Sequence, residues 1–172
     1  IAIQRGVGTS THGSAAFGAT VDLQTNTVST EPFARLSSSY GSYQTNKNTL
    51  QWGSGKINKN ISVEGRLSQI KSDGYIDRAA SNLKSYFVSA VYQPAKSLLK
   101  LVHFVGSEKT FQAWWGVPQD SLKTNRRYNF FNYPNEIDRF RQDHYQAFFT
   151  HRFSTRWTLN TALHYTYGRG FF

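Results

Sequence analysis

Hydrophobic and polar side chains alternate over strand-length segments along most of the chain after residue 32. Residues 61–70, ISVEGRLSQI, alternate apolar and polar side chains with a period of two. The same alternation recurs in residues 33–43, 83–93 and 143–153, and it is longest in 157–168. Because successive side chains of a strand point to opposite faces of a sheet, these segments predict an all-β, antiparallel chain whose strands have one apolar and one polar face.

The polar connections between these segments alternate in length. Short turns are predicted at residues 58–60, 94–97 and 154–156, whereas the long connections are 72–82 and 106–141. Aromatic side chains stand near the ends of several strands, namely Phe33, Tyr40, Tyr92, Phe153, Trp157, Tyr165 and Tyr167. Short turns at one end, long loops at the other and aromatic strand ends favour transmembrane β-strands of an outer-membrane barrel. A soluble sandwich with one face in water has the same periodicity and stays open as an alternative.

The composition suits a β protein and does not exclude a membrane barrel. Hydrophobic residues make up 38% of the 172 residues and aromatic residues 16%, and no apolar stretch is long enough for a transmembrane helix. Transmembrane strands of about 9–11 alternating residues would still be compatible with it. The chain has no Cys and no Met, and it shows no signal peptide, so we expect a mature or truncated chain.

A net charge of +10 suggests nucleic acid, an anionic surface or an acidic ligand as a partner. The basic residues are scattered, with no run of five or six.

Residues 3–25, IQRGVGTSTHGSAAFGATVDLQT, resemble the C-terminal end of the plug domain of TonB-dependent outer-membrane receptors. Nine residues fall on the family pattern: Ile3, Arg5, Gly6, Ser10, Gly13, Ala16, Gly18, Val21 and Thr25. Ala19 stands where the family usually has a second Gly, and Asp22 where it has Asn. The segments SDGYIDRA (72–79), SYFVSAVY (85–92) and GSEKTFQAWWGV (106–117) resemble early loops and strands of the same family.

The resemblance implies a fragment of a larger receptor. Residues 1–27 would end the plug domain, and residues 28–172 would form the first six or seven strands of a barrel of about 22 strands. Most of the plug, the TonB box and the other strands would be missing. Because an open sheet edge is not tolerated in hydrocarbon, we expect that these residues alone would not insert stably.

The family imports ferric siderophores, haem, cobalamin or glycans by plug movement that TonB energises. For this chain the resemblance implies transport of a scarce large solute, most of all a ferric siderophore or other iron chelate. It also implies the outer membrane of a Gram-negative bacterium, with TonB, outer-membrane lipid and lipopolysaccharide (LPS) as partners and no nucleic acid. Neither a cofactor nor a catalytic residue is expected, so the chain is predicted not to be an enzyme.

The long segment 108–141 is the best candidate for contact with the solute. Arginines would pair with an anionic chelate, and aromatic rings would cover its organic shell. The candidate ligand-binding residues are His12, Trp114, Trp115, Arg126, Arg127, Tyr128 and Phe131. Alternatively, the rings pack the loop onto its neighbours and the charges only solvate it.

The plug motif has its own candidates, which are structural. Arg5, Gly6, Gly13 and Gly18 would shape tight turns, and Arg5 would pair with an acid such as Glu64. His12 could instead be a hydrogen-bonded turn residue. The other histidines lack metal-ligand spacing, so no metal site is predicted, and His144 and His164 are expected to face the lumen.

Two other classes of protein remain as alternatives. An uncoupled porin or adhesin-type barrel would have no plug, which the motif in residues 3–25 argues against. A soluble basic β domain that binds single-stranded nucleic acid needs aromatic and basic residues on one sheet face. The pattern predicts that these two kinds of side chain lie mostly on opposite faces or in a loop.

Overall fold

The computed structural model describes residues 2–6, 18–22 and 29–172. Its strands, in chain order, are β1 (Ala2–Arg5), β2 (Ala19–Asp22), β3 (Pro32–Gly41), β4 (Thr45–Ser54), β5 (Ile61–Ser72), β6 (Ser81–Tyr92), β7 (Ser97–Phe111), β8 (Ile137–Arg152) and β9 (Thr158–Phe171). One short 3-10 helix, η1 (Ser121–Lys123), lies between β7 and β8. The prediction of an all-β, antiparallel chain is confirmed.

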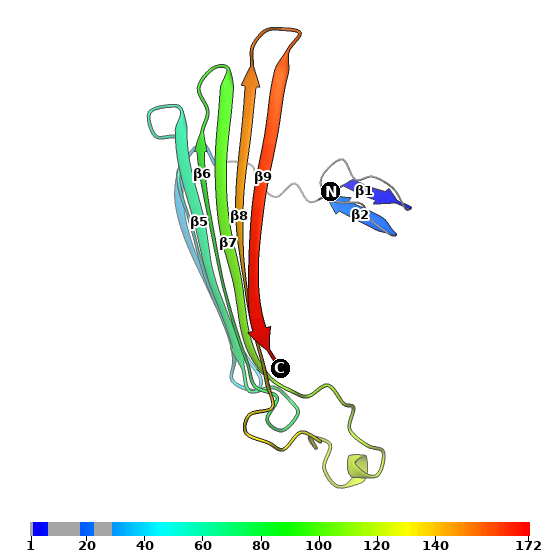
Figure 1. Ribbon diagram of the computed structural model, residues 1–172. Helices are drawn as coiled ribbons and strands as arrows, with labels where there is room; N and C mark the ends of the chain where they lie inside the picture. The colour runs from blue at the N-terminus through cyan, green and yellow to red at the C-terminus, as the bar shows by residue number, and fades with distance from the viewer. Residues whose placement is uncertain (1, 7–17, 23–28) are drawn as a thin grey trace.

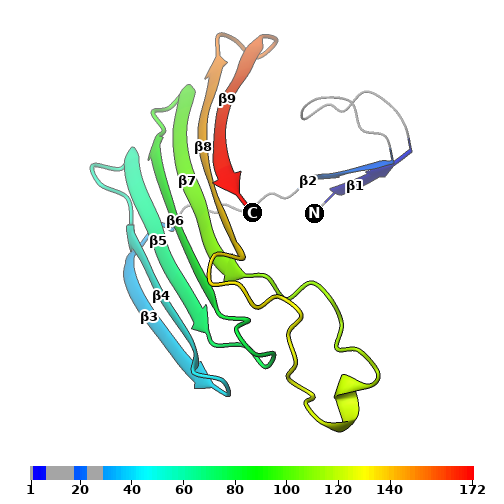
Figure 2. The same cartoon turned by 60° about the horizontal axis from the view of Figure 1, so that its bottom comes forward.

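Strands β3 to β9 form one seven-stranded sheet in which each strand pairs with the next along the chain. Every pairing is antiparallel, and the sheet is a single curved layer (Figures 1 and 2). The sheet is not closed, because β3 and β9 each have one strand neighbour among the described residues. Strands β1 and β2 form a separate antiparallel pair.

The register of the strands gives the sheet two chemically different faces. One cross-strand row contains Leu36, Leu50, Leu67, Tyr86 and Val105, and we call the face that carries it the apolar face. The adjacent row, on the opposite face, contains Ser37, Thr49, Ser68, Ser85 and Gly106, and we call that face the polar face. Strands β5 to β9 have 12 to 16 residues each, which exceeds the roughly 9–11 that a tilted strand needs to cross a bilayer.

The connections differ between the two ends of the sheet. Residues 55–60, 93–96 and 153–157 join strands at the short-turn end, and residues 73–80 and 112–136 form longer loops at the other end, where the β3–β4 turn also lies. The expected turn at residues 58–60 is present, with positive φ at Asn58 and Lys59. Figure 2 shows the longest loop projecting from the sheet.

The predicted loop, residues 106–141, is longer than the loop in the structure, residues 112–136. Strand β7 continues to Phe111 and β8 begins at Ile137, and these two residues face each other across the ladder. The apolar signal fades here because the side chains that continue the apolar face are Lys109, Arg139 and Arg141. The two strands therefore extend beyond the segments in which hydrophobic and polar residues alternate.

Most large side chains of the apolar face are exposed in this single layer. Leu36 is 76% exposed, Leu163 67% and Tyr165 61%, whereas the buried hydrophobic residues among those described are Val91, Val102 and Val105. A contiguous apolar surface of this kind is typical of contact with lipid or protein. No helix of the described residues is both long and apolar enough to cross a membrane.

Candidate ligand-binding loops

The two long loops are joined to each other by an aspartate and an arginine. The backbone N–H of Asp77 donates to the carbonyl oxygen of Arg127 at 2.8 Å. The Arg127 Nε lies 3.2 Å from Asp77 Oδ1 and donates to the Tyr75 carbonyl at 2.9 Å. Both side chains of the ion pair are about half exposed, at 52% and 44%. This contact fixes loop 112–136 against loop 73–80.

Asn129 is the buried centre of this junction. Its Nδ2 donates to the carbonyl oxygens of Asp77 at 2.9 Å and of Gln112 at 3.0 Å. Its Oδ1 accepts a hydrogen bond from the backbone N–H of Phe131 at 3.0 Å. With 9% of its surface exposed, Asn129 connects both loops to the end of β7. The sequence analysis missed this residue, because an isolated Asn within an aromatic run carries no local signal of burial.

Aromatic rings form a connected, solvent-facing cluster on the longer loop. Ring centroids lie 6.1 Å apart for Trp114 and Phe131, 6.1 Å for Trp115 and Phe130, and 6.0 Å for Phe130 and Phe131. The ring of Phe172, beyond the end of β9, lies 6.2 Å from Trp114. Trp114, Trp115 and Phe130 are each more than 60% exposed. We call Trp114, Trp115, Phe130 and Phe131 the aromatic cluster, and its rings are available to an organic ligand.

The structure places six of the predicted ligand-binding residues in this loop and separates their roles. Trp114, Trp115 and Phe131 come together in the aromatic cluster. Arg126 is exposed, as is Tyr128 at 37%, and Arg127 is held by Asp77. Phe130 was not among the predicted site residues and joins the two tryptophans through Phe131. His12 lies outside the described residues.

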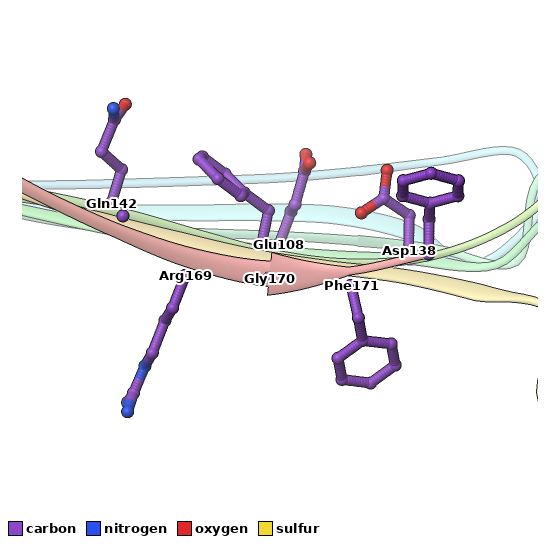
Figure 3. Close-up of a pocket in the computed structure, with 9 residues that line it drawn as sticks. Glu108, Asp138, Gln142, Arg169, Gly170 and Phe171 are labelled. Atoms are coloured by element: carbon purple, nitrogen blue, oxygen red, sulfur yellow. The ribbon is translucent and has the colours of Figure 1, made fainter.

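Carboxylate and amide side chains lie on the polar face close to the same loop. Glu108, Asp138 and Gln142 project to one side of the sheet at the loop end of β7 and β8, while Arg169 and Phe171 of β9 project to the other (Figure 3). These residues line a shallow hollow at the edge strand β9. The hollow is open, and Phe172, which also lines it, is the residue that contacts Trp114 of the aromatic cluster.

The histidines are divided between the two faces. His144 pairs with Thr166 and His164 with Gln146 on the polar face, as predicted. His103 and His151 lie on the apolar face, where His103 stacks on Tyr145 at a centroid distance of 4.1 Å. The described residues contain no group of three or more side chains that could hold a metal ion.

The plug-motif candidates are described only in part. Gly6 follows β1 with a φ of 100°, and its N–H donates to the carbonyl oxygen of Gly18 at 2.7 Å. The two glycines thus close the β1–β2 pair, and the positive φ at position 6 favours Gly there. Arg5 is exposed and makes no ion pair with Glu64, and Gly13 lies outside the described residues.

Comparison with known proteins finds similarity to one named receptor from two bacterial strains. It is 30% identical over 178 aligned positions to the metal-pseudopaline receptor CntO of Pseudomonas aeruginosa strain PAO1, and 29% identical to the same receptor of strain UCBPP-PA14. Each alignment covers 98% of this chain but only 24% of the receptor, so the chain spans about a quarter of the length of these relatives. No family model and no solved structure matches the chain.

Proposed function

We propose that these residues belong to a longer outer-membrane receptor that imports a metal held in an organic chelator. The observation that carries the proposal is the alignment of nearly the whole chain with a metal-pseudopaline receptor. The open edges of β3 and β9 support it, because further strands would have to cover them in hydrocarbon. The apolar face would then contact lipid, and the polar face would line the lumen.

The aromatic cluster is the proposed contact for the chelate. Exposed Trp and Phe rings bury organic surface efficiently, and Arg126 in the same loop offers a positive charge to an anionic complex. The solute leaves chemically unchanged, so the protein is proposed to be a transporter and not an enzyme. A ferric chelate is the more specific proposal, and it rests on the resemblance of residues 3–25 to the plug domain of TonB-dependent receptors.

Binding by the intact receptor tests the role of the aromatic cluster. Replacing both Trp114 and Trp115 with Ala should weaken binding of a metal-loaded chelate about tenfold, or ~1.4 kcal/mol. The matched control is Trp157→Ala, which removes a 74% exposed indole from the short-turn end of the sheet and should change affinity less than about twofold. An equal loss of affinity in both variants would contradict the proposal that the loop binds the ligand.

Growth under metal limitation tests the function as a whole. A strain that lacks the receptor should fail to use one or more chelates from a panel loaded with iron, zinc or nickel, and the intact gene should restore growth. Collapse of the proton gradient across the inner membrane should stop uptake but leave binding unchanged, because TonB is proposed to draw the energy for uptake from that gradient. Uptake that continues without the gradient would favour an uncoupled porin.

A further inference from the structure

Alternate residues of the longer loop, at positions 125, 127 and 129, contact one residue of the shorter loop, Asp77. The Asn125 Nδ2 donates to Asp77 Oδ2 at 3.3 Å, and the Arg127 Nε lies 3.2 Å from Asp77 Oδ1. The backbone of Asp77 is held as well, because its N–H donates to the Arg127 carbonyl at 2.8 Å and its carbonyl accepts from Asn129 Nδ2 at 2.9 Å. Asp77 thus fixes loop 112–136 at these three positions.

The two asparagines of this stretch also shape its backbone. Asn125 Oδ1 accepts a hydrogen bond from the Arg127 N–H at 2.9 Å, and Asn129 Oδ1 accepts one from the Phe131 N–H at 3.0 Å. A hydrogen bond from a backbone N–H to the side chain of an Asn two residues earlier closes an Asx turn. The second turn runs from Asn129 to Phe131, so Asn129 determines the backbone that carries the two phenylalanines of the aromatic cluster.

Asn129 is also joined to the part of the loop that leads to the tryptophans. Its Nδ2 donates to the Gln112 carbonyl at 3.0 Å, and Gln112 precedes Trp114 by two positions. Gln112 is itself buried, and its N–H donates to the Glu136 carbonyl at 2.9 Å. One buried amide therefore connects the two stretches of chain that carry the aromatic cluster, residues 114–115 and 130–131.

Burial separates Asn129 from the rings that it connects. Because Trp114, Trp115 and Phe130 are mostly exposed, their positions depend on the backbone that carries them. Asn129 is buried, and both its amide nitrogen and its amide oxygen are hydrogen-bonded within the protein. An amide with its donors and its acceptor already engaged has little to offer a ligand. Any effect of Asn129 on ligand binding must therefore act through the position of the rings.

We propose that Asn129 and Asp77 are positioning residues that hold the aromatic cluster ready for the chelate. The shorter loop, residues 73–80, then contributes to affinity without contacting the chelate, because rings that are already in place lose less freedom on binding. The coupling is reciprocal, so bound chelate must stabilise the junction of the two loops by the same factor. The inference rests on the proposed function, because it takes the aromatic cluster as the contact for the chelate.

A double-mutant cycle in the intact receptor tests the proposal. The probe is the metal-loaded chelate of the growth panel that the unmodified receptor binds most tightly. We expect Asn129→Ala to raise the dissociation constant about fivefold, and the matched control Asn132→Ala, an exposed asparagine of the same loop, to raise it less than about twofold. In a receptor that already lacks the indoles of Trp114 and Trp115, Asn129→Ala should add less than about twofold, because the rings through which it acts are gone.

Hydrogen exchange of the shorter loop measures the same coupling from the other side. Bound chelate should slow exchange of residues 73–80 about fivefold in the unmodified receptor and less than about twofold in the Asn129→Ala receptor. Heat-dependent gel migration reports whether each variant is folded. If Asn129→Ala does not fold, Asn129→Asp takes its place, because it keeps the acceptor for the Phe131 N–H and loses both donors. It should weaken binding about threefold.

The outcomes separate this proposal from the proposed function. Unchanged affinity in the Asn129 variants, or an equal loss with and without the two tryptophans, would overturn the positioning role and leave the chelate contact in place. Exchange of residues 73–80 that bound chelate does not slow would overturn it as well. If removal of both tryptophans leaves the affinity unchanged, the proposed chelate contact is rejected, and the positioning role is rejected with it.

Discussion

The polar and apolar faces of the seven-stranded sheet come from the same strands, yet their side chains differ in the partners they have within the sheet. On the polar face, hydroxyl and amide groups bond across strands, as Thr49 does with Ser68 at 2.9 Å and Thr150 with Asn160 at 2.9 Å. On the apolar face, Leu163 and Tyr165 stand more than 60% exposed. The polar face is stable in water, whereas the apolar face needs a non-aqueous partner. The two faces are therefore suited to different surroundings.

The largest expected effect comes from a charge placed on the apolar face. Leu163 and Ala162 are neighbours on β9 and point to opposite faces. Leu163→Arg should lower the free energy of unfolding of the intact receptor in a bilayer by about 2–4 kcal/mol, because it places a charge in hydrocarbon. Ala162→Arg should cost less than about 1 kcal/mol. Denaturant titration in vesicles measures both, and equal losses would contradict the assignment of the faces.

Close packing gives the second contrast between the faces. A Cβ atom added to Gly65 on the apolar face would lie 2.6 Å from Cε2 of Trp52, whereas one added to Gly106 on the polar face meets nothing within 4 Å. We expect Gly65→Ala to destabilise the receptor by about 1–3 kcal/mol, because the indole must move. Gly106→Ala should change stability by about 0.5 kcal/mol or less. Equal effects in the same titration would show that the Trp52 ring does not cover Gly65.

The long loops offer a third contrast, because the buried side chain of Asn129 lies among exposed polar side chains. Asn129→Ala leaves the carbonyl groups of Asp77 and Gln112 without their donor and should cost about 1–3 kcal/mol locally. Hydrogen exchange of residues 112–136 should accelerate accordingly. The control, Asn125→Ala, alters an exposed side chain and should cost about 1 kcal/mol or less. Unchanged exchange in the Asn129 variant would contradict its role as the centre of the junction.

The smallest effect is expected from the exposed ion pair of the loops. Asp77→Asn should cost about 0.2–1 kcal/mol, because both partners are half exposed and the attraction is screened. The difference from the unmodified receptor should vanish in 1 M salt, where charges are screened within about 3 Å. Asp73→Asn is the control for loss of one exposed carboxylate, and it should have no measurable effect. A cost that survives high salt would indicate a structural role beyond the charge.

The sequence predicted the strands and their faces where hydrophobic residues mark the alternation, as in residues 61–70 and 157–168. It failed where outward positions are basic, because Lys109 and Arg139 hide the continuation of β7 and β8. It also expected aromatic and basic side chains mostly on opposite faces or in a loop, and this is wrong for Lys71 and Arg169, which share the apolar face with Tyr86 and Tyr145. Lys71 and Arg169 lie far apart in the chain, and only the antiparallel register brings them into adjacent rows.

The candidate site was predictable by residue type but not by arrangement. Aromatic enrichment singled out the loop that carries Trp114 and Trp115, and ligand binding by this loop stays a prediction. The partners of these side chains depend on contacts between loops, as in the case of Arg127 and Asp77, which lie 50 positions apart in the chain. Such contacts leave no local pattern, so whether an arginine is held or exposed can be read only from the folded chain.

Site-directed labelling tests the central claim, that the apolar face contacts lipid and the polar face does not. The chain has no Cys, so Leu163→Cys and Ala162→Cys each introduce one labelling position within these residues. A fluorophore at position 163 of the intact receptor should be quenched by nitroxide-labelled lipid and be shielded from a water-soluble quencher. A fluorophore at position 162 should show the reverse. Equal exposure of both positions to the water-soluble quencher would contradict the account.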